Sequence, residues 1–153
     1  MRYLVVGGVA VVLHGHLRTT ADLDLSVALD RDNALRTVAA LKGIGFRPRA
    51  PVPMEQFADA SARASWVEEK GLTVFSVWSD RCPGLEVDLF VREPVEFEVA
   101  WGRRVVVQLG STRAAVASLA DLLAMKRAAG RPQDLADVVA LEALGKDESG
   151  GST

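Results

Sequence analysis

The chain has one cysteine, Cys82, among its 153 residues. A single cysteine cannot form an internal disulfide, and it cannot supply the several thiolates of a cysteine zinc cluster. This scarcity fits a reducing compartment, and we expect the protein to be cytoplasmic. Cys82 precedes Pro83 in an expected turn and has no identifiable base to activate its thiol, so we expect it to be inert.

An excess of positive charge is also absent. Eighteen Lys and Arg residues stand against twenty Asp and Glu residues, which gives a net charge of -2 at pH 7. A protein without overall positive charge has no general electrostatic attraction for nucleic acid or for an anionic membrane, so any polyanion must meet a local patch. The balance of charge argues against a protein that coats DNA.

Long hydrophobic runs are missing as well. The apolar opening, residues 3–13, is interrupted by Gly7-Gly8, is too short to span a membrane and lacks the cleavage region of a signal peptide. No internal repeat or interior linker appears, and 49% hydrophobic residues suffice for one compact core. We therefore predict one domain over residues 1–145, a flexible tail over residues 146–153 and no membrane segment.

Hydrophobic periodicity predicts an α+β fold with a mixed, mostly antiparallel sheet and helices packed chiefly on one face. Asp30 and Ser118 are expected helix caps, and Gly130 is an expected helix end. Three of the six prolines fall in residues 47–53, so we expect residues 47–64 to form a weakly helical excursion over the surface. The expected strands are residues 2–6, 22–27, 72–78, 85–91 and 103–109.

Acidic residues occupy one face of two expected strands. In the segment 22–27 a strict alternation puts Asp22, Asp24 and Ser26 on one face, and Asp88 occupies a later strand. Carboxylates on neighbouring strands repel one another unless a cation neutralises them. Mg²⁺ prefers oxygen ligands, and a pair of such ions clamps the attacking and leaving oxygens of an in-line displacement. The pattern predicts phosphoryl or nucleotidyl transfer.

Each of these features also has a purely structural interpretation. Alternating Asp22 and Asp24 are compatible with a solvated strand face, and Glu86 shares a face with Asp88 and could replace it. Gly7-Gly8 alone is typical of a tight turn, although glycine backbone also allows a phosphate to approach closely. We expect Trp78, like the other two tryptophans, to pack in the core or at its rim.

Two segments resemble a known family. The run from Gly7-Gly8 through Arg18-Thr19-Thr20-Ala21-Asp22-Leu23-Asp24-Leu25 resembles the signature of the DNA polymerase β-type nucleotidyltransferase superfamily, in which a Gly-Gly or Gly-Ser turn precedes an Asp-x-Asp strand. Residues 121–137 resemble the AbiEii-like branch, the nucleotidyltransferase toxins of type IV toxin-antitoxin systems. The resemblance covers most of residues 3–144.

The resemblance implies roles for particular residues. Asp22, Asp24 and Asp88 would bind Mg²⁺ or Mn²⁺, and Asp88 would also act as the base for the acceptor hydroxyl. Gly7 and Gly8 would hold the triphosphate of an NTP. The remaining implied positions are Arg18 with Thr19 or Thr20, which would contact phosphate or position the strand, and the functional residues Lys126 and Asp134.

The residues themselves leave alternatives open for the later segment. Lys126 is in register with an apolar helical stripe, so a lysine that snorkels from the core explains it equally well. Asp134 and Asp137 follow Pro132 at an expected helix start, where carboxylates complement the helix dipole. Arg131 is expected to be solvated unless the family match holds.

The implied activity is transfer of a nucleoside monophosphate from an NTP to a hydroxyl of RNA, with tRNA as one candidate, or of a protein. The chain would then be a toxin with an antitoxin partner. Relatives usually carry a helix before the Gly-Gly strand, so we expect the edge of strand 3–6 to be covered in a homo- or hetero-oligomer. The competing hypothesis is a degenerate, non-catalytic binding module that acts within a complex.

Overall fold

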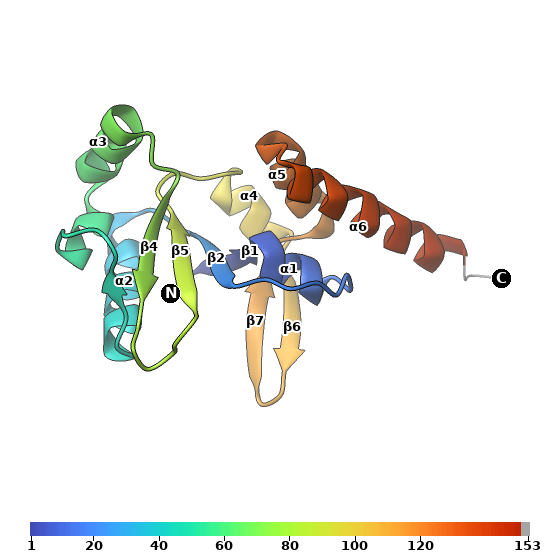
Figure 1. Cartoon of the computed structure of the whole chain (residues 1–153), viewed down its shortest axis with the longest axis horizontal. Coiled ribbons are helices and arrows are strands. Elements are labelled where there is room, and N and C mark those ends of the chain that lie inside the picture. The colour runs from blue at the N-terminus through green and yellow to red at the C-terminus, as the bar shows by residue number, and fades with distance from the viewer. Residues whose placement is uncertain (151–153) are drawn as a thin grey trace.

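The computed structural model describes residues 1–150, which form one sheet with helices on both faces (Figure 1). In chain order the elements are β1 (Tyr3–Val6), α1 (Gly7–Leu13), β2 (Asp22–Val27), α2 (Arg31–Gly43), β3 (Arg47–Pro48), η1 (Met54–Ala58), α3 (Ala60–Lys70), β4 (Val74–Trp78), β5 (Glu86–Phe90), α4 (Phe97–Gly102), β6 (Val105–Leu109), β7 (Thr112–Val116), α5 (Leu119–Ala129) and α6 (Pro132–Gly150).

The seven strands are ordered β3-β4-β5-β2-β1-β7-β6. Four neighbouring pairs are antiparallel, and two pairs, β1 with β7 and β2 with β5, are parallel. The prediction of a mixed, mostly antiparallel sheet is therefore confirmed. The expectation that residues 3–6 form an exposed edge is wrong, because β1 lies in the middle of the sheet with Leu4, Val5 and Val6 buried.

The sheet separates two apolar clusters of unequal size. The larger one packs Val5, Leu25 and Val27 against residues from α1, α2, η1, α3, α5 and α6. The smaller one packs Leu4 and Val6 against Phe97 and Ala100 of α4. Helices thus cover chiefly one face, as predicted, and most of the opposite face is left for polar side chains.

Local sequence signals fix several helix ends. The side chain of Asp30 accepts a hydrogen bond from the Asn33 amide at 2.9 Å, and Ser118 Oγ accepts one from the Asp121 amide at 3.2 Å. Gly130 ends α5 with a φ of 64°, a conformation that favours glycine. The three predicted boundaries are confirmed.

Residues 47–64 are not the surface excursion that their prolines suggested. Arg47–Pro48 pairs with β4 as a two-residue edge strand, a position that proline tolerates because one side of the strand is unpaired. Phe57 of η1 is fully buried, and Trp66 of α3 stacks on Phe75 with ring centres 5.1 Å apart. This segment therefore closes the core on the β4 side.

The C-terminal half departs from expectation in three places. The structure adds the short helix α4 and the strand β7, neither of which the sequence pattern predicted. Helix α6 continues to Gly150, beyond the predicted start of the tail at Lys146, and residues 151–153 of that tail lie outside the described residues. No helix within residues 1–150 has the length and apolar character needed to cross a membrane.

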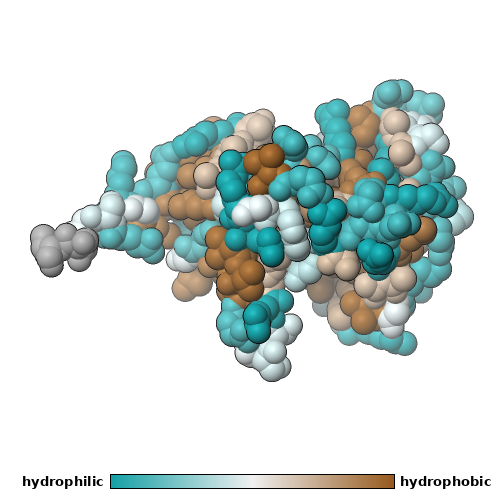
Figure 2. Space-filling model, turned by 180° about the vertical axis from the view of Figure 1, so that it is seen from behind, coloured by the Kyte–Doolittle hydropathy of each residue, from teal (hydrophilic) through white to brown (hydrophobic). Residues whose placement is uncertain are grey.

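The β6–β7 hairpin leaves the body of the molecule and carries an apolar surface. Val105, Val106 and Leu109 are each more than 40% exposed, and Figure 2 shows hydrophobic surface where the hairpin joins the body. Strand β6 is at the edge of the sheet, so within residues 1–150 no strand lies beside its outer hydrogen-bonding groups.

Candidate active site

Acidic side chains line up across two neighbouring strands on the face opposite the larger core. Strands β2 and β5 are parallel neighbours, and their register places Asp24 opposite Asp88 and Asp22 opposite Glu86. The alternation in β2 sends Leu23 and Leu25 to the larger core and the aspartates to the other face. The predicted acidic face is thus formed by a strand pairing that spans about sixty residues of chain.

The carboxylates of this face raise one another's proton affinity. Burial, together with the charges of Asp88 and Asp22, raises the pKa of Asp24 to about 6 from the ordinary value of 3.8. Burial also raises the pKa of Asp88, against a hydrogen bond of 2.5 Å that it accepts from Ser76 Oγ. Within residues 1–150 none of the three aspartates forms an ion pair.

The Gly-Gly turn lies directly against Asp24. Gly7 has a φ of 66°, and a Cβ atom at this position would overlap the carboxylate of Asp24. A Cβ atom on Gly8 would overlap Thr20 Oγ1 and lie 3.0 Å from Arg18 Nη2. The structure therefore brings both glycines, Arg18 and Thr20 together beside Asp24, on the β1 side of β2. Thr19 is exposed, and its carbonyl accepts a hydrogen bond of 2.9 Å from Arg18 Nη1.

A buried ion network borders this region on the side of α5 and α6. The Lys126 ammonium, which is only 7% exposed, lies 3.0 Å from both Asp134 Oδ1 and Asp137 Oδ2. Arg18 donates two hydrogen bonds to Asp137, at 2.8 and 2.9 Å, and Arg131 Nε donates one to Asp134 at 2.7 Å. The network links Arg18, in the segment between α1 and β2, with the turn between α5 and α6.

In this network the cations outweigh burial in setting the pKa values of the two aspartates. Burial raises the pKa of Asp134, but hydrogen bonds from Arg131 and Lys126 outweigh burial and hold it below its ordinary value. Burial is likewise outweighed at Asp137, whose pKa is lowered by hydrogen bonds from Arg18 and Lys126. Lys126 is therefore buried in ion pairs and does not snorkel to solvent, and Asp134 and Asp137 pair with it as well as lying at the start of a helix. A role of Lys126 and Asp134 in the reaction stays a prediction.

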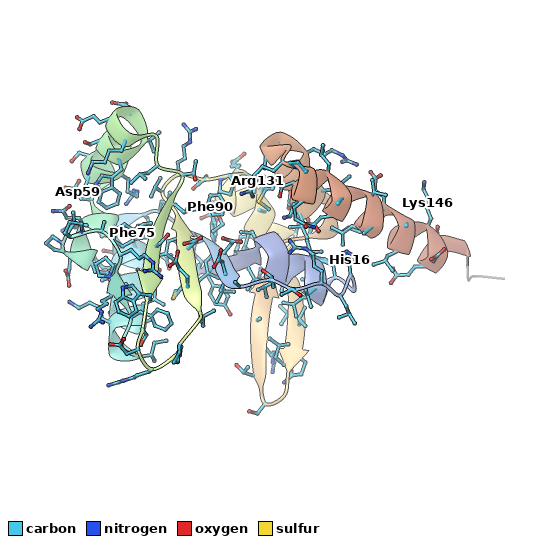
Figure 3. All side chains as sticks on the ribbon, in the orientation of Figure 1. His16, Asp59, Phe75, Phe90, Arg131 and Lys146 are labelled. Carbon is cyan, nitrogen blue, oxygen red and sulfur yellow. The ribbon has the colours of Figure 1, made fainter. Side chains whose placement is uncertain are left out.

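The network also acts on the acidic face. The positive charges of Lys126 and Arg131 lower the pKa of Asp24 through Coulomb attraction, so both cations act electrostatically on the acidic face. Arg131, labelled in Figure 3, comes from the turn between α5 and α6, and its side chain is 77% exposed despite its bond to Asp134. Exposed Arg131 is the member of the network most accessible to a ligand.

A cavity of about 380 Å³ opens beside Asp22 at the other end of the acidic face. Its lining residues are Asp22, Arg49, Trp78, Ser79, Asp80, Cys82, Pro83, Gly84, Leu85 and Glu86. Sequence reasoning did not connect Ser76 or Trp78 with the site. The alternation in residues 74–78 is the signal that would have placed both on the face that carries Asp88.

A histidine contact and the prediction of metal binding concern the surroundings of the site. His14 Nε2 lies 2.8 Å from the Ala117 carbonyl, so it ties α1 to the end of β7. Among residues 1–150 no three His, Cys, Asp or Glu side chains are arranged as a ready-made metal cluster. An ion at Asp22, Asp24 and Asp88 would need oxygen ligands from elsewhere as well.

Comparisons with known proteins identify a sequence family and a similar fold. Residues 1–146 match a sequence family described as "Nucleotidyltransferase of unknown function (DUF6036)". The chain is also similar to the crystal structure of the lincosamide antibiotic adenylyltransferase LnuA, lincomycin-bound, with a TM-score of 0.57 and 14% identity. That similarity covers 92% of this chain and 85% of LnuA, and it shows a shared fold. No functionally curated protein matches the sequence.

Proposed function

Since the chain belongs to the DUF6036 family of nucleotidyltransferases, we propose that it transfers a nucleoside monophosphate from an NTP to a hydroxyl group. The observation that carries this proposal is the placement of Asp24. Its carboxylate faces Asp88 across β2 and β5 and at the same time touches Gly7 at the Gly-Gly turn. Transfer from a triphosphate uses carboxylates that hold metal ions and a glycine turn whose backbone can approach the phosphates closely.

The donor set suits a divalent cation. Three carboxylates that form no ion pair within residues 1–150, one of them with its pKa raised to about 6, lie on one face of β2 and β5. Mg²⁺ is typically held by one or two carboxylates together with waters and substrate phosphates. Asp22, Asp24 and Asp88 would hold Mg²⁺ or Mn²⁺, and the ion would supply positive charge to the transferring phosphate.

The proposed reaction is an in-line displacement at the α-phosphorus of the NTP. The acceptor oxygen forms a bond to the α-phosphorus, and the bond from that phosphorus to the bridging oxygen of the β-phosphate breaks. Pyrophosphate leaves, and the hydroxyl proton passes to Asp88, whose carboxylate lies opposite Asp24 in the register of β2 and β5. Backbone at Gly7 and Gly8, with Arg18 and exposed Arg131, would bind the departing phosphates.

The acceptor and the biological role rest on the sequence resemblance. Similarity of residues 121–137 to AbiEii-like toxins favours RNA, such as tRNA, or a protein as the acceptor, and an antitoxin as a partner. We propose that the chain is a toxin that modifies such an acceptor and that an antitoxin is its partner. The buried contacts of Lys126 with Asp134 and Asp137 support the view that this segment belongs to the same site as the aspartates.

Incubation with each α-labelled NTP, Mg²⁺ and either total RNA or cell lysate tests the activity and identifies the labelled species. We expect one class of acceptor to be labelled by the wild type and none by Asp24→Asn. The matched control is Asp147→Asn, which makes the same chemical change on the exposed surface of α6. Labelling by Asp24→Asn at the wild-type rate would contradict the proposed role of the aspartates.

The competing hypothesis is a degenerate module that has the fold but does not catalyse transfer. A working site gains about 2.7 kcal/mol of stability at a ligand concentration one hundred times Kd, whereas a site that binds nothing gains none. Melting the protein with Mg²⁺ and each NTP therefore separates the two hypotheses. Absence of any NTP-dependent shift together with absence of labelling would favour the degenerate module.

A further inference from the structure

The cavity beside Asp22 lies on the opposite side of the aspartates from the Gly-Gly turn. Across the sheet the order is β1, β2, β5, β4. Gly7 follows β1 and touches Asp24 from that side, whereas the cavity is walled by the end of β4, the turn 79–85 and the start of β5. An in-line displacement places the attacking and leaving oxygens on opposite sides of the phosphorus.

We infer that this cavity is the acceptor site and that its ligand is a single ribonucleoside, either free or at the 3′ end of an RNA. The inference rests on the proposed function, because the Gly-Gly turn must hold the leaving pyrophosphate. The acceptor hydroxyl then enters from the β5 side. Asp88, the proposed base, is two residues from the cavity residue Glu86 on the same face of β5.

The Trp78 side chain lines the cavity and stacks against an arginine. The Arg47 guanidinium lies 4.0 Å from the centre of the Trp78 ring and pairs with Asp80 at 2.9 Å. Arg47 does not line the cavity, so it supports the indole from outside. Single-stranded RNA ends are recognised by stacking of bases on aromatic rings and guanidinium planes.

Charged groups are also available at the cavity wall. Arg49 lines the cavity, pairs with Glu86 and lies 5.7 Å from the Trp78 ring centre. A guanidinium beside a stacked base is suited to the phosphate on the 5′ side of a nucleoside. Asp22 and Glu86 provide acceptors for ribose hydroxyls at the end of the cavity next to Asp24.

The size of the cavity is compatible with a single nucleoside. A volume of about 380 Å³ is near the lower end for sites that enclose a small molecule. One nucleoside fills such a space, whereas a serine or threonine side chain of a protein leaves most of it empty. The net charge of -2 argues against an extended RNA-binding groove, so an RNA would present only its terminal residue.

Cys82 provides a direct test because it is the only cysteine and lines the cavity. Although we expect no base to activate its thiol, an ordinary accessible thiol still reacts with iodoacetamide at alkaline pH. Alkylation by iodoacetamide, followed by intact mass, reports whether the cavity is filled. The probes are the four nucleosides, a short RNA with a free 3′ hydroxyl, and a non-hydrolysable NTP with Mg²⁺. We expect a nucleoside or the RNA, at ten times its Kd, to slow alkylation about tenfold, because about one site in eleven is then free. The NTP analogue alone should leave the rate within twofold.

The pattern of protection identifies the source of the ribonucleoside. Protection by a free nucleoside assigns a small-molecule acceptor, and protection by RNA alone assigns an RNA end; both support the site. Protection by the NTP analogue alone would show that the cavity holds the nucleotide base instead. Lack of protection by every ribonucleoside probe, with NTP-dependent melting shifts intact, would overturn the acceptor site and leave the proposed function standing. Loss of those shifts would count against the proposed function itself.

Tryptophan variants provide the second measurement. We expect Trp78→Ala to weaken binding of the protecting ribonucleoside roughly 5- to 100-fold, the range for loss of a stacked base, while Trp78→Phe retains most of the affinity. Affinity is taken from the concentration that halves Cys82 alkylation, so no turnover is needed. Trp101→Phe is the matched control, because Trp101 also stacks on an arginine, Arg104, at 4.0 Å but lies outside the cavity. Equal affinities for wild type, Trp78→Ala and Trp78→Phe would overturn the stacking role.

Discussion

Replacing Asp24 by asparagine should stabilise the protein when divalent metal is removed. Asp24 is half-buried, faces Asp88 in the register of β2 and β5, and has its pKa raised from 3.8 to about 6 by burial and by its acidic neighbours. A raised carboxyl pKa means that the folded protein binds this proton more tightly than the unfolded chain does. The ionised carboxylate therefore lowers stability at every pH above the folded pKa.

The magnitude follows from the size of the shift. A difference of about two pKa units corresponds to about 3 kcal/mol at pH 8, where Asp24 is ionised in both states. Asparagine removes the charge but keeps a buried amide, so we expect a net gain of about 1 to 2 kcal/mol. In a domain of this size that gain raises Tm by roughly 3 to 6 °C.

The pH dependence distinguishes charge from other effects of the substitution. As pH falls through 6 the wild-type carboxyl becomes protonated in the folded state, so the loss of stability caused by Asp24 decreases to about half at pH 5. The lowered pKa values of Asp134 and Asp137 act only below about pH 4 and do not enter this window. The advantage of Asp24→Asn over the wild type should shrink accordingly.

The assay is thermal or urea unfolding in chelator at pH 8 and pH 5, with Asp147→Asn as the surface control. Addition of Mg²⁺ at pH 8 should raise the Tm of the wild type and leave that of Asp24→Asn nearly unchanged. An advantage of equal size at both pH values, or an Asp24→Asn variant less stable than the wild type at pH 8, would refute the electrostatic reasoning.

Three further predictions concern the glycine turn, the ion network and a helix end. Gly7→Ala should lose at least 1 kcal/mol of stability and most nucleotidyl transfer, because its φ of 66° and the Asp24 carboxylate leave no place for a Cβ; Gly102→Ala, where nothing lies within 4 Å, is the control for melting and transfer assays. Lys126→Met should lower the free energy of unfolding by about 3 to 5 kcal/mol in urea titrations, since it leaves two buried carboxylates without their shared cation, and an unchanged midpoint would contradict the buried pairing. Gly130→Ala should lower stability by about 1 kcal/mol, because φ is 64° there, without affecting NTP-dependent melting shifts.

Local chemistry in the sequence determined much of what surrounds the site. The period-two alternation of residues 22–27 put the aspartates on one face whatever the strand pairs with, since that period is a property of the strand alone. Asp30, Ser118 and Gly130 marked helix ends because caps are made within a few residues of the chain. Strand alternation and helix caps can therefore be recognised in a single sequence.

Only the tertiary structure decided which of these pieces meet. Strand order is not encoded locally, so β1 was mistaken for an edge strand, although it lies between β2 and β7. The prolines of residues 47–53 gave no sign that η1 places Phe57 in the core, because proline limits the backbone and says little about burial. Pairing of β2 with β5 brings Asp88 to Asp24, and packing of α5 on α6 encloses Lys126 between two aspartates. These contacts join residues far apart in the chain, and their free energy comes from burial and charge that exist only once the sheet and helices have assembled.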